Sequence, residues 1–369
     1  MPNKDKNIPK RRFKEFENAD AWELRKFKDI LKTHSFRSYL AGVSENGEYE
    51  VIQQGDKPIV GYFDGEPFTD YKDVTLFGDH TVSLYKPKSP FFVATDGVKI
   101  LSADNFEGDY LYTTLERYKP EPQGYKRHFT ILKNQDVCFT ENMEEQQKIG
   151  VFFKQLDATI TLHQRKLDKL KSVKQAYLSE MFPAEGERVP KRRFPGFTDA
   201  WELQNVGEIC RISTGKSNTQ DREEQGKFPF YVRSPIIEKS TKYLFDEEAV
   251  LTVGDGVGTG KVFHYVHGKY DLHQRVYRMF SFTHVNAKYF YYYFSKKFFD
   301  RVMAMTAKNS VDSVRLEMIS DMEITIPQLE EQEKIVKILS TLDQQITLHQ
   351  RKLEKLKNLK KALLNELFV

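Results

Sequence analysis

Cysteine is scarce in this sequence: only Cys138 and Cys210 occur among 369 residues, and they lie far apart. Two such residues form neither a disulfide framework nor a zinc site of paired cysteines, which favours a reducing, cytoplasmic compartment. No uninterrupted apolar stretch reaches 18 residues, and the N-terminal run MPNKDKNIPKRRF has no apolar segment of the kind found in signal peptides. We therefore expect neither secretion nor a membrane-spanning helix.

Motifs of catalysis and metal binding are also missing. The nine histidines show no HExxH or HxH spacing, and no GxSxG nucleophile motif occurs. Imidazoles at those spacings would share one face of a helix or strand and converge on a metal ion, so their absence argues against a metal site. The sequence thus predicts a chain with neither a catalytic centre nor a metal of its own.

One glycine-rich segment, VGDGVGTGKV at 253–262, resembles a phosphate-binding loop but fails on spacing. A loop that ends at Gly260-Lys261 needs glycine where Asp255 stands, and Val262 replaces the hydroxyl residue that would bind magnesium. A methyltransferase cofactor loop is also short and glycine-rich, yet no DPPY- or NPPF-like tetrapeptide is present. We interpret the segment as a turn whose glycines permit positive φ or close backbone approach.

The chain contains a long internal repeat. Residues 144–182 align without gaps to residues 330–368, with 23 of 39 positions identical, including the string ITLHQRKL in both copies. A second repeat precedes it, because PKRRFKEFENADAWEL at 9–24 matches PKRRFPGFTDAWEL at 190–203. The order is therefore short motif, variable region, long segment, and then the same again. Such an order permits a molecule with a pseudo-two-fold relation between its halves.

The long segments are predicted to be helices that pair with each other. Apolar residues recur at alternating steps of four and three, which is typical of a coiled-coil seam. The expected interface residues are Leu156, Ile160, His163, Leu167, Leu170 and Tyr177 in the first copy, and Leu342, Ile346, His349, Leu353, Leu356 and Leu363 in the second. Pairing is expected to be antiparallel, and some 35 residues at ~1.5 Å each make a rod of roughly 50 Å.

Four polar residues interrupt this seam: His163, His349, Lys174 and Lys360. They suit either a register lock or protonation-sensitive packing. The favoured alternative is a lysine that extends its amine into solvent, together with a histidine satisfied at the helix edge. Each long segment also carries surplus positive charge, with seven basic against three acidic residues in 148–182 and eight against three in 334–368. Lysine-rich outer faces of this kind are either solvated or dock other proteins.

The variable regions, roughly 25–143 and 204–329, differ from each other but share landmarks. GEYEVIQQ at 47–54 corresponds to GKFPFYVR at 226–233, and VTLFGDH at 74–80 corresponds to VLTVGDG at 250–256. Their β-branched and alternating runs predict strands joined by turns. The aromatic segment KYFYYYFSKKFF at 288–299 predicts a helix with one buried face, although base stacking is an alternative.

Basic and amide side chains in the turns of both regions are candidates for nucleic-acid contact. Gly124–His128 combines a turn with cations, and His273-Gln274-Arg275 offers groups that can bond adenine and guanine edges. Ordinary surface roles are the alternative for all of them. The candidates are His80, Thr81, Tyr125, Lys126, Arg127, Arg233, Lys261, Gln274, Arg275, Lys308 and Arg315.

This combination of motifs resembles the specificity subunit of type I restriction–modification enzymes. The resemblance covers nearly the whole chain and is carried by EEQ at 144–146, PQLEEQ at 327–332, both ITLHQRKL strings and GKYDLHQRVY at 268–277. The first copy departs from it, because FTENMEEQ stands where a proline-containing IPxLEEQ is usual. The exit from the first variable region is therefore expected to be atypical.

The resemblance implies an α+β fold: two mixed α/β target recognition domains separated by an antiparallel two-helix coiled coil in a pseudo-two-fold repeat. The expected divisions are 1–143, 144–182, 183–329 and 330–369. It also implies that the chain binds double-stranded DNA at a two-part site, sets the spacer with its helices, and docks two methyltransferase subunits and the restriction/translocase subunits. S-adenosylmethionine, ATP and magnesium would be bound by those partners. A self-sufficient DNA methyltransferase and a coiled-coil scaffold that binds no DNA remain alternatives.

Overall fold

The computed structural model describes residues 7–124, 126–256, 258–305 and 313–369. The chain divides into two compact units, of which unit 1 comprises Met1–Arg165 with His349–Val369 and unit 2 comprises Lys166–Leu348. Each unit therefore takes half of both long helices. The divisions expected from the sequence, at 143, 182 and 329, keep each long segment whole. The compact units instead divide the chain within both long helices, after residues 165 and 348.

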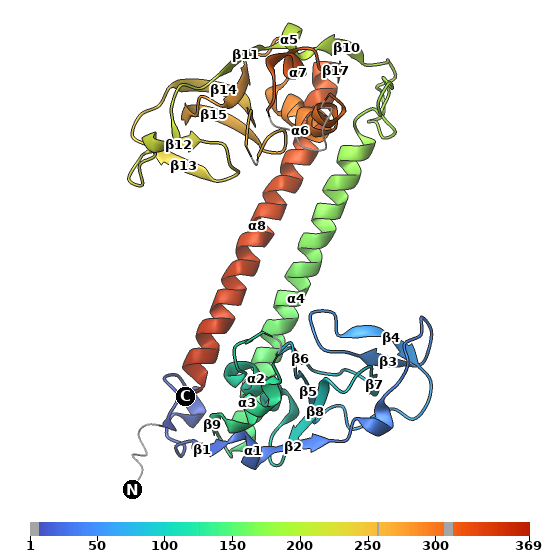
Figure 1. The fold of residues 1–369 in the computed structure, drawn as a ribbon, viewed down its shortest axis with the longest axis vertical. Helices are drawn as coiled ribbons and strands as arrows, with labels where there is room; N and C mark the ends of the chain where they lie inside the picture. Colours follow the sequence, from blue (N-terminus) through green and yellow to red (C-terminus); the bar gives the residue numbers. More distant parts are fainter. Residues whose placement is uncertain (1–6, 125, 257, 306–312) are drawn as a thin grey trace. The chain divides into compact units, whose positions relative to one another are not determined.

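Unit 1 contains three small sheets within its described residues (Figure 1). The first sheet pairs β1 (Glu23–Lys26) with β9 (Asp136–Phe139). The second sheet has the strand order β2 (Leu31–His34), β8 (Val98–Ala103), β5 (Thr75–Gly78), β6 (Leu84–Tyr85). The third sheet has the strand order β4 (Ile59–Phe63), β3 (Tyr49–Ile52), β7 (Phe91–Val93). The helices beside them are α1 (Phe27–Ile30), α2 (Gly108–Tyr118) and α3 (His128–Asn134), with single 3-10 turns η2 (Lys14–Phe16) and η3 (Arg37–Tyr39).

Unit 2 repeats these pairings with one larger sheet. Its strands follow the order β11 (Arg211–Thr214), β16 (Val276–Phe280), β14 (Phe245–Val253), β15 (Phe263–Leu272), β12 (Phe228–Tyr231), β13 (Ile237–Ser240), while β10 (Glu202–Asn205) pairs with β17 (Glu323–Ile326). Its helices are α5 (Val206–Ile209), α6 (Ala287–Ala304) and α7 (Leu316–Ser320), with the turn η4 (Thr219–Asp221).

The landmarks shared by the two variable regions lie on corresponding strands. β3 and β12 each pair with one antiparallel neighbour, β4 or β13, and with one parallel neighbour, β7 or β15. In unit 2 a single long strand, β15, pairs with both β14 and β12. In unit 1 the corresponding run is divided into β6 and β7, and Pro87 and Pro90 lie between them. Proline has no N–H for the ladder, so one sheet becomes two.

The core of unit 2 confirms the helix with one buried face that was predicted for 288–299. In α6 the aromatic rings of Tyr289, Phe290, Phe294 and Phe298 are fully buried, so this segment forms core and is not a surface for base stacking. Each core is completed by an aromatic residue at the end of a long segment. Phe182 packs 5.6 Å from Tyr289, centroid to centroid, in unit 2. In unit 1, Phe368 packs 5.6 Å from Trp22 and 5.9 Å from Tyr110.

The two long helices are α4 (Met143–Glu180) and α8 (Leu329–Leu367). Both begin within a residue of the position expected from the repeat. Asn142 caps α4, because its Oδ1 accepts the N–H groups of Glu144 and Glu145 at 3.0 and 3.1 Å. Every predicted seam residue is buried or half-buried, and most residues between them are exposed. The heptad pattern therefore identified the packed face of both helices.

Contacts within the units show that the helices run antiparallel. In unit 1, Asp157 Oδ1 lies 2.6 Å from Lys360 Nζ, and His163 Nδ1 lies 3.2 Å from His349 Nδ1. In unit 2, Lys174 Nζ lies 2.5 Å from Asp343 Oδ1. The partner number falls as the residue number rises, as antiparallel pairing requires. These two ion pairs are equivalent in the repeat, because Asp157 corresponds to Asp343 and Lys174 corresponds to Lys360.

The polar residues of the seam do not extend into solvent, so the favoured interpretation of the two lysines was wrong. Lys360 is only 9% exposed and binds both Asp157 and Glu116 of α2. The two histidines, which are equivalent in the repeat, contact each other instead of lying at the helix edge. A hydrogen bond between two Nδ1 atoms needs one donor and one acceptor, so at least one of the two rings accepts through an unprotonated Nδ1.

Replacement of Lys360 by methionine is expected to destabilise unit 1 by about 1–2 kcal/mol, because two carboxylates then face each other without their cation. The effect stays below that of a fully buried pair, since Glu116 and Asp157 are 22% and 34% exposed and partly solvated. Chemical denaturation should show the loss, and the exposed neighbour Lys361→Met should leave stability unchanged. Equal stability of the two variants would contradict a stabilising role for the ion pair.

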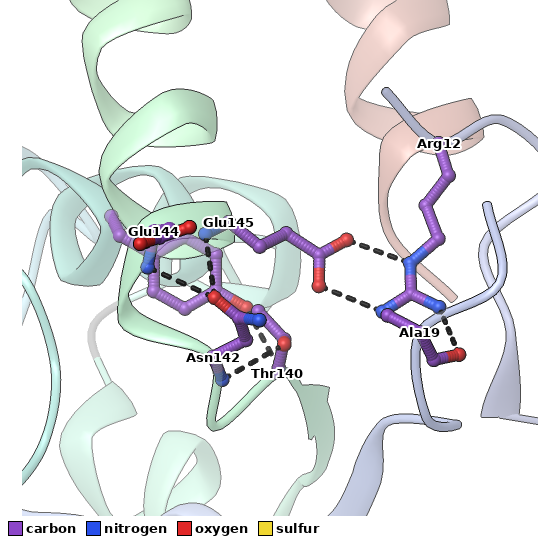
Figure 2. A network of polar contacts seen from close by, with 7 residues as sticks. Arg12, Ala19, Thr140, Asn142, Glu144 and Glu145 are labelled. Carbon is purple, nitrogen blue, oxygen red and sulfur yellow. Dashed lines mark hydrogen bonds and ion pairs between the residues drawn. The ribbon is translucent and has the colours of Figure 1, made fainter. Parts of the chain in front are cut away.

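A buried ion pair joins the two repeated motifs in each unit. In unit 1, Arg12 Nε and Nη2 each lie 2.7 Å from an oxygen of the Glu145 carboxylate, and Arg12 Nη1 also donates to the Ala19 carbonyl (Figure 2). In unit 2, Arg193 contacts Glu331 in the same two-pronged way, at 2.8 and 2.9 Å. The short motif thus clamps the start of the long helix, which explains why both motifs repeat together.

The glutamine that follows each of these glutamates anchors the helix to the variable region. Gln146 Oε1 accepts the N–H of Glu107, which caps α2, and Gln332 Oε1 accepts the N–H of Asn286, which caps α6, both at 2.8 Å. Their Nε2 atoms donate to the carbonyls of Thr140 and Pro327, respectively. The first copy lacks the usual proline but makes the same bonds, so its exit is not atypical in this respect.

No helix in the described part of the chain is both long and apolar enough to span a membrane.

Both cysteines are buried thiols, and burial raises the pKa of Cys210 to about 12. Such a thiol stays protonated and packs as a small apolar group.

Candidate nucleic-acid interface

A tight turn in unit 2 carries three of the residues singled out in the sequence. His273, Gln274 and Arg275 connect β15 to β16, and their backbone is held on several sides. Gln274 N–H donates to the Ser217 carbonyl at 2.9 Å, and Gly254 N–H donates to the Arg275 carbonyl at 2.8 Å. The turn is therefore rigid, while the side chains of Gln274 and Arg275 are exposed.

His273 is the buried anchor of this turn. Its ring Nδ1 accepts the backbone N–H of Arg275 at 3.0 Å, and the backbone N–H of His273 donates to the Tyr231 carbonyl. Desolvation lowers the pKa of His273, and the nearby Arg233 and Arg275 lower it further. The ring is therefore neutral near pH 7, as an Nδ1 that accepts a hydrogen bond must be.

Around the turn lies a shallow polar cleft of about 450 Å³. Its lining residues are Asn218, Thr219, Gln220, Arg233, Asp255, His273, Gln274 and Arg275. Three predicted candidates, Arg233, Gln274 and Arg275, thus meet in one place. Asp255 lies between the two arginines, 3.4 Å from Arg233 Nη1 and 3.7 Å from Arg275 Nε. With two guanidinium groups, one carboxylate and a neutral histidine, the cleft is positive and rich in hydrogen-bonding groups.

The glycine-rich segment contributes Asp255 to the cleft, and its described residues 258–261 form a turn, as predicted. Gly256 and Gly260 have φ of +82° and +65°, a conformation that glycine adopts at little cost. At Gly254 a Cβ would come within 2.8 Å of the Arg275 carbonyl, so only glycine allows this approach. Lys261 is exposed, and its Nζ lies 4.9 Å from the centroid of the Phe299 ring instead of in the cleft.

Another candidate of the second variable region, Arg315, is not among the described residues that line the cleft. Arg315 precedes α7 with an exposed side chain, and the adjacent Val314 N–H donates to the Gly254 carbonyl at 2.7 Å. Lys308 lies outside the described residues. Tyr125, a candidate of the first variable region, lies outside them as well.

In unit 1 the candidates His80, Thr81, Lys126 and Arg127 lie on two loops that touch. His128 N–H donates to the Asp79 carbonyl at 2.8 Å, which joins the loop after β5 to the loop before α3. Lys126, Arg127 and Thr81 are exposed, whereas His80 is half-buried and its N–H donates to Gln54 Oε1. His128 ends the cation-bearing segment that was predicted to contact nucleic acid, but its ring is fully buried and holds the loop.

The corresponding aspartates of the two units have different roles. Asp79 is buried, accepts the Phe129 N–H at 2.9 Å and lies 3.8 Å from Lys99 Nζ. Asp255, at the same place in the shared VTLFGDH and VLTVGDG runs, contacts the two arginines of the cleft. The residue of the first variable region that aligns with Arg233 is Gln54, and its Oε1 accepts the backbone N–H of His80. The two variable regions therefore present different chemistry on related frameworks.

Asn218 and Asp255 also line the cleft, although neither was predicted as a candidate from the sequence. Asn218 Oδ1 accepts from Gln274 Nε2 at 2.5 Å although 56 residues separate them, and no local pattern indicates this contact. Asp255 had a detectable signal, since its Gly-Asp step recurs in both variable regions. Within the described ranges, no group of three or more histidine, cysteine, aspartate or glutamate residues has a metal-binding arrangement.

A family model described as "Type I restriction modification DNA specificity domain" matches residues 19–172 and again residues 198–358, which together make up most of the chain. The chain belongs to this family. The two matches follow the internal repeat, and each spans one variable region with most of the long helix that follows it. The matched ranges include Glu145 and Glu331, whereas their clamp partners Arg12 and Arg193 lie in the short motifs before those ranges.

Two curated specificity subunits are similar to parts of this specificity-family chain. The EcoDI type I restriction enzyme specificity subunit of Escherichia coli is 24% identical over 156 residues, which are 42% of this chain and 34% of that protein. The MjaVIII specificity subunit of Methanocaldococcus jannaschii is 26% identical over 208 residues, 53% of this chain and 47% of that protein. The chain thus spans less than half the length of these relatives.

The fold of this specificity-family member is shared with a solved structure over nearly the whole chain. The crystal structure of the type I restriction-modification S subunit from M. genitalium aligns with a TM-score of 0.72 at 16% identity, covering 98% of this chain and 99% of that one. The likeness confirms the expected α+β fold with two repeated mixed domains and long helices.

Proposed function

We propose that this chain recognises duplex DNA at a two-part sequence, with each variable region reading one part, and that it catalyses no reaction itself. One observation carries the proposal. Equivalent ion-pair clamps hold the two variable regions to their long helices, but the two regions present different side chains. A positive cleft of arginine, glutamine and asparagine in unit 2 offers the groups that bond base edges.

The helices supply the second part of the proposal, which is docking of partner subunits. Each ITLHQRKL string exposes one large apolar residue at the same place: Leu162 is 65% exposed and Leu348 is 63% exposed. Equivalent exposed leucines beside lysines suit two copies of one partner. On this proposal two methyltransferase subunits bind the helices, restriction/translocase subunits join them, and these partners carry S-adenosylmethionine, ATP and magnesium. The helices set the unread spacer between the two parts of the site.

The test is an exchange of one variable region. The chain is produced together with its methyltransferase subunit, and modified bases are mapped by sequencing the DNA of the host cell. Replacement of residues 204–329 by the variable region of another specificity chain should change one part of the modified sequence and leave the other part and the spacer unchanged.

Two controls separate this proposal from the alternatives. The isolated chain should bind no labelled S-adenosylmethionine, since binding would indicate a self-sufficient methyltransferase. The complex should show salt-dependent affinity for duplex DNA, which a scaffold that binds only proteins would lack. Persistence of the whole original sequence after the exchange would refute the proposed function.

A further inference from the structure

The turn His273–Arg275 presents two adjacent side chains from a fixed backbone. The N–H groups of Gln274 and Arg275 are bonded to Ser217 and His273, and the Arg275 carbonyl accepts from Gly254. The Arg275 side chain is nevertheless 66% exposed. Because the backbone of the turn is already held from several sides, binding needs to order only the side chains, so the arrangement suits recognition of a defined surface.

Asn218 orients the amide of Gln274. Gln274 Nε2 donates one of its two hydrogens to Asn218 Oδ1 at 2.5 Å. The second N–H and the carbonyl oxygen of Gln274 then remain for a ligand. In the major groove adenine presents an acceptor, N7, next to a donor, the N6 amine. The remaining groups of Gln274 complement that pair, and the bond to Asn218 resists rotation of the amide into the opposite orientation.

Asp255 performs the matching role for Arg275. Its Oδ2 lies 3.7 Å from Arg275 Nε, on the stem side of the guanidinium, and its Oδ1 contacts Arg233. Contact at Nε leaves the two terminal Nη nitrogens of Arg275 for a ligand. Guanine presents two neighbouring acceptors, O6 and N7, and an arginine fork donates to both. Arg233, which also lines the cleft, adds positive charge beside them.

We infer that Gln274 and Arg275 determine an adenine and a neighbouring guanine in the part of the DNA site read by the second variable region, an inference that rests on the proposed function. Asn218 and Asp255 are positioning residues that act through Gln274 and Arg275. In the described part of the first variable region, the residues that align with Asp255 and Arg233 are Asp79 and Gln54, and both accept hydrogen bonds from backbone N–H groups instead of orienting a neighbouring side chain. The two parts of the site therefore differ in sequence.

The experiment uses the complex of the full chain with its methyltransferase subunit and a library of duplex DNA in which both parts of the site are randomised. Bound sequences are determined for the unaltered complex and for Arg275→Ala, Gln274→Ala, Asn218→Ala and Asp255→Asn. We expect Arg275→Ala to reduce the preference for one guanine about ten- to a hundredfold, and Gln274→Ala to do the same at an adjacent adenine, since a bidentate pair discriminates by that much.

The positioning residues have a distinct signature. Asn218→Ala should weaken preference at the adenine assigned to Gln274, and Asp255→Asn should weaken it at the guanine assigned to Arg275, each by less than loss of the reading residue. Arg275→Lys keeps the charge and should retain affinity and salt dependence while losing the guanine preference. The control Lys216→Ala removes an exposed cation outside the cleft and should lower affinity for all sequences equally.

The outcomes separate the inference from the function beneath it. If the unaltered complex selects no two-part sequence, the proposed function fails. If it selects one, and the four variants keep the same bases in the second part, the inference is overturned while the function stands. A purely structural role for these residues would reduce affinity without changing base preference, and this result would overturn the inference as well.

Discussion

Glu145→Gln is expected to destabilise unit 1 by about 3–5 kcal/mol, the usual result of leaving one member of a buried ion pair unpaired. The carboxylate is completely buried, and both of its oxygens bond to Arg12, whose side chain is itself only 5% exposed. Glutamine has the same shape, so the substitution leaves no cavity. The loss would come from the positive charge of Arg12, which would remain buried without its counter-charge.

Hydrogen exchange is the appropriate measurement, because it reports each unit separately. Peptides of unit 1 should exchange more than about a hundredfold faster, since 1.4 kcal/mol corresponds to a factor of ten, while peptides of unit 2 stay protected. Glu331→Gln should reverse the pattern. Glu144→Gln, at an exposed neighbouring position, should change neither unit. Equal exchange in Glu144→Gln and Glu145→Gln would contradict a stabilising clamp.

Gly150→Val is expected to destabilise unit 1 by about 3 kcal/mol, at the upper end of the usual cost of overpacking. A Cβ on Gly150 would lie 2.5 Å from Glu107 Oε2 and 2.7 Å from the backbone nitrogen of Tyr110. Glu107 caps α2 through that same N–H, so the valine would displace both the cap and the helix backbone. The equivalent position in the second repeat is Val336, which packs against the core of unit 2.

The repeat itself supplies the contrast for this prediction. By sequence, Gly150→Val makes the first helix more like the second, and it also improves helix propensity. Only the close approach of α2 to α4 makes it unfavourable. Thermal unfolding should show the loss, and Val151→Ala, at an exposed neighbouring position, serves as the control. If Gly150→Val raised the unfolding temperature, the close packing of these two helices would be refuted.

The internal repeat and the heptad spacing allowed much of the fold to be predicted. Identity between residues 144–182 and 330–368 showed that two equivalent helices exist, and the spacing of leucines indicated which face is buried. Both signals are local, since a helical stripe depends on residues three and four apart. The cation-rich turns were predicted as candidates in the same way, and the structure brings Arg233, Gln274 and Arg275 together.

The partners of individual polar groups could not be predicted from spacing. Arg12 and Glu145 are separated by 133 residues, and Lys360 and Glu116 by 244, so no periodic pattern relates them. The lysines of the seam were expected to reach solvent because lysine commonly does so. Instead each finds an aspartate on the facing helix, and a buried amine is stable only where a carboxylate compensates its charge.

What the sequence by itself determined is the plan of the molecule: two repeats, two long helices with a defined packed face, and two dissimilar variable regions whose family match follows the same division. Only the tertiary structure decided what each shared residue does. Asp79 and Asp255 stand in the same short motif, yet one is buried beneath the loop before α3 and the other contacts two arginines of a cleft. The physical reason is that burial and charge pairing depend on segments distant in the chain, which a local pattern does not specify.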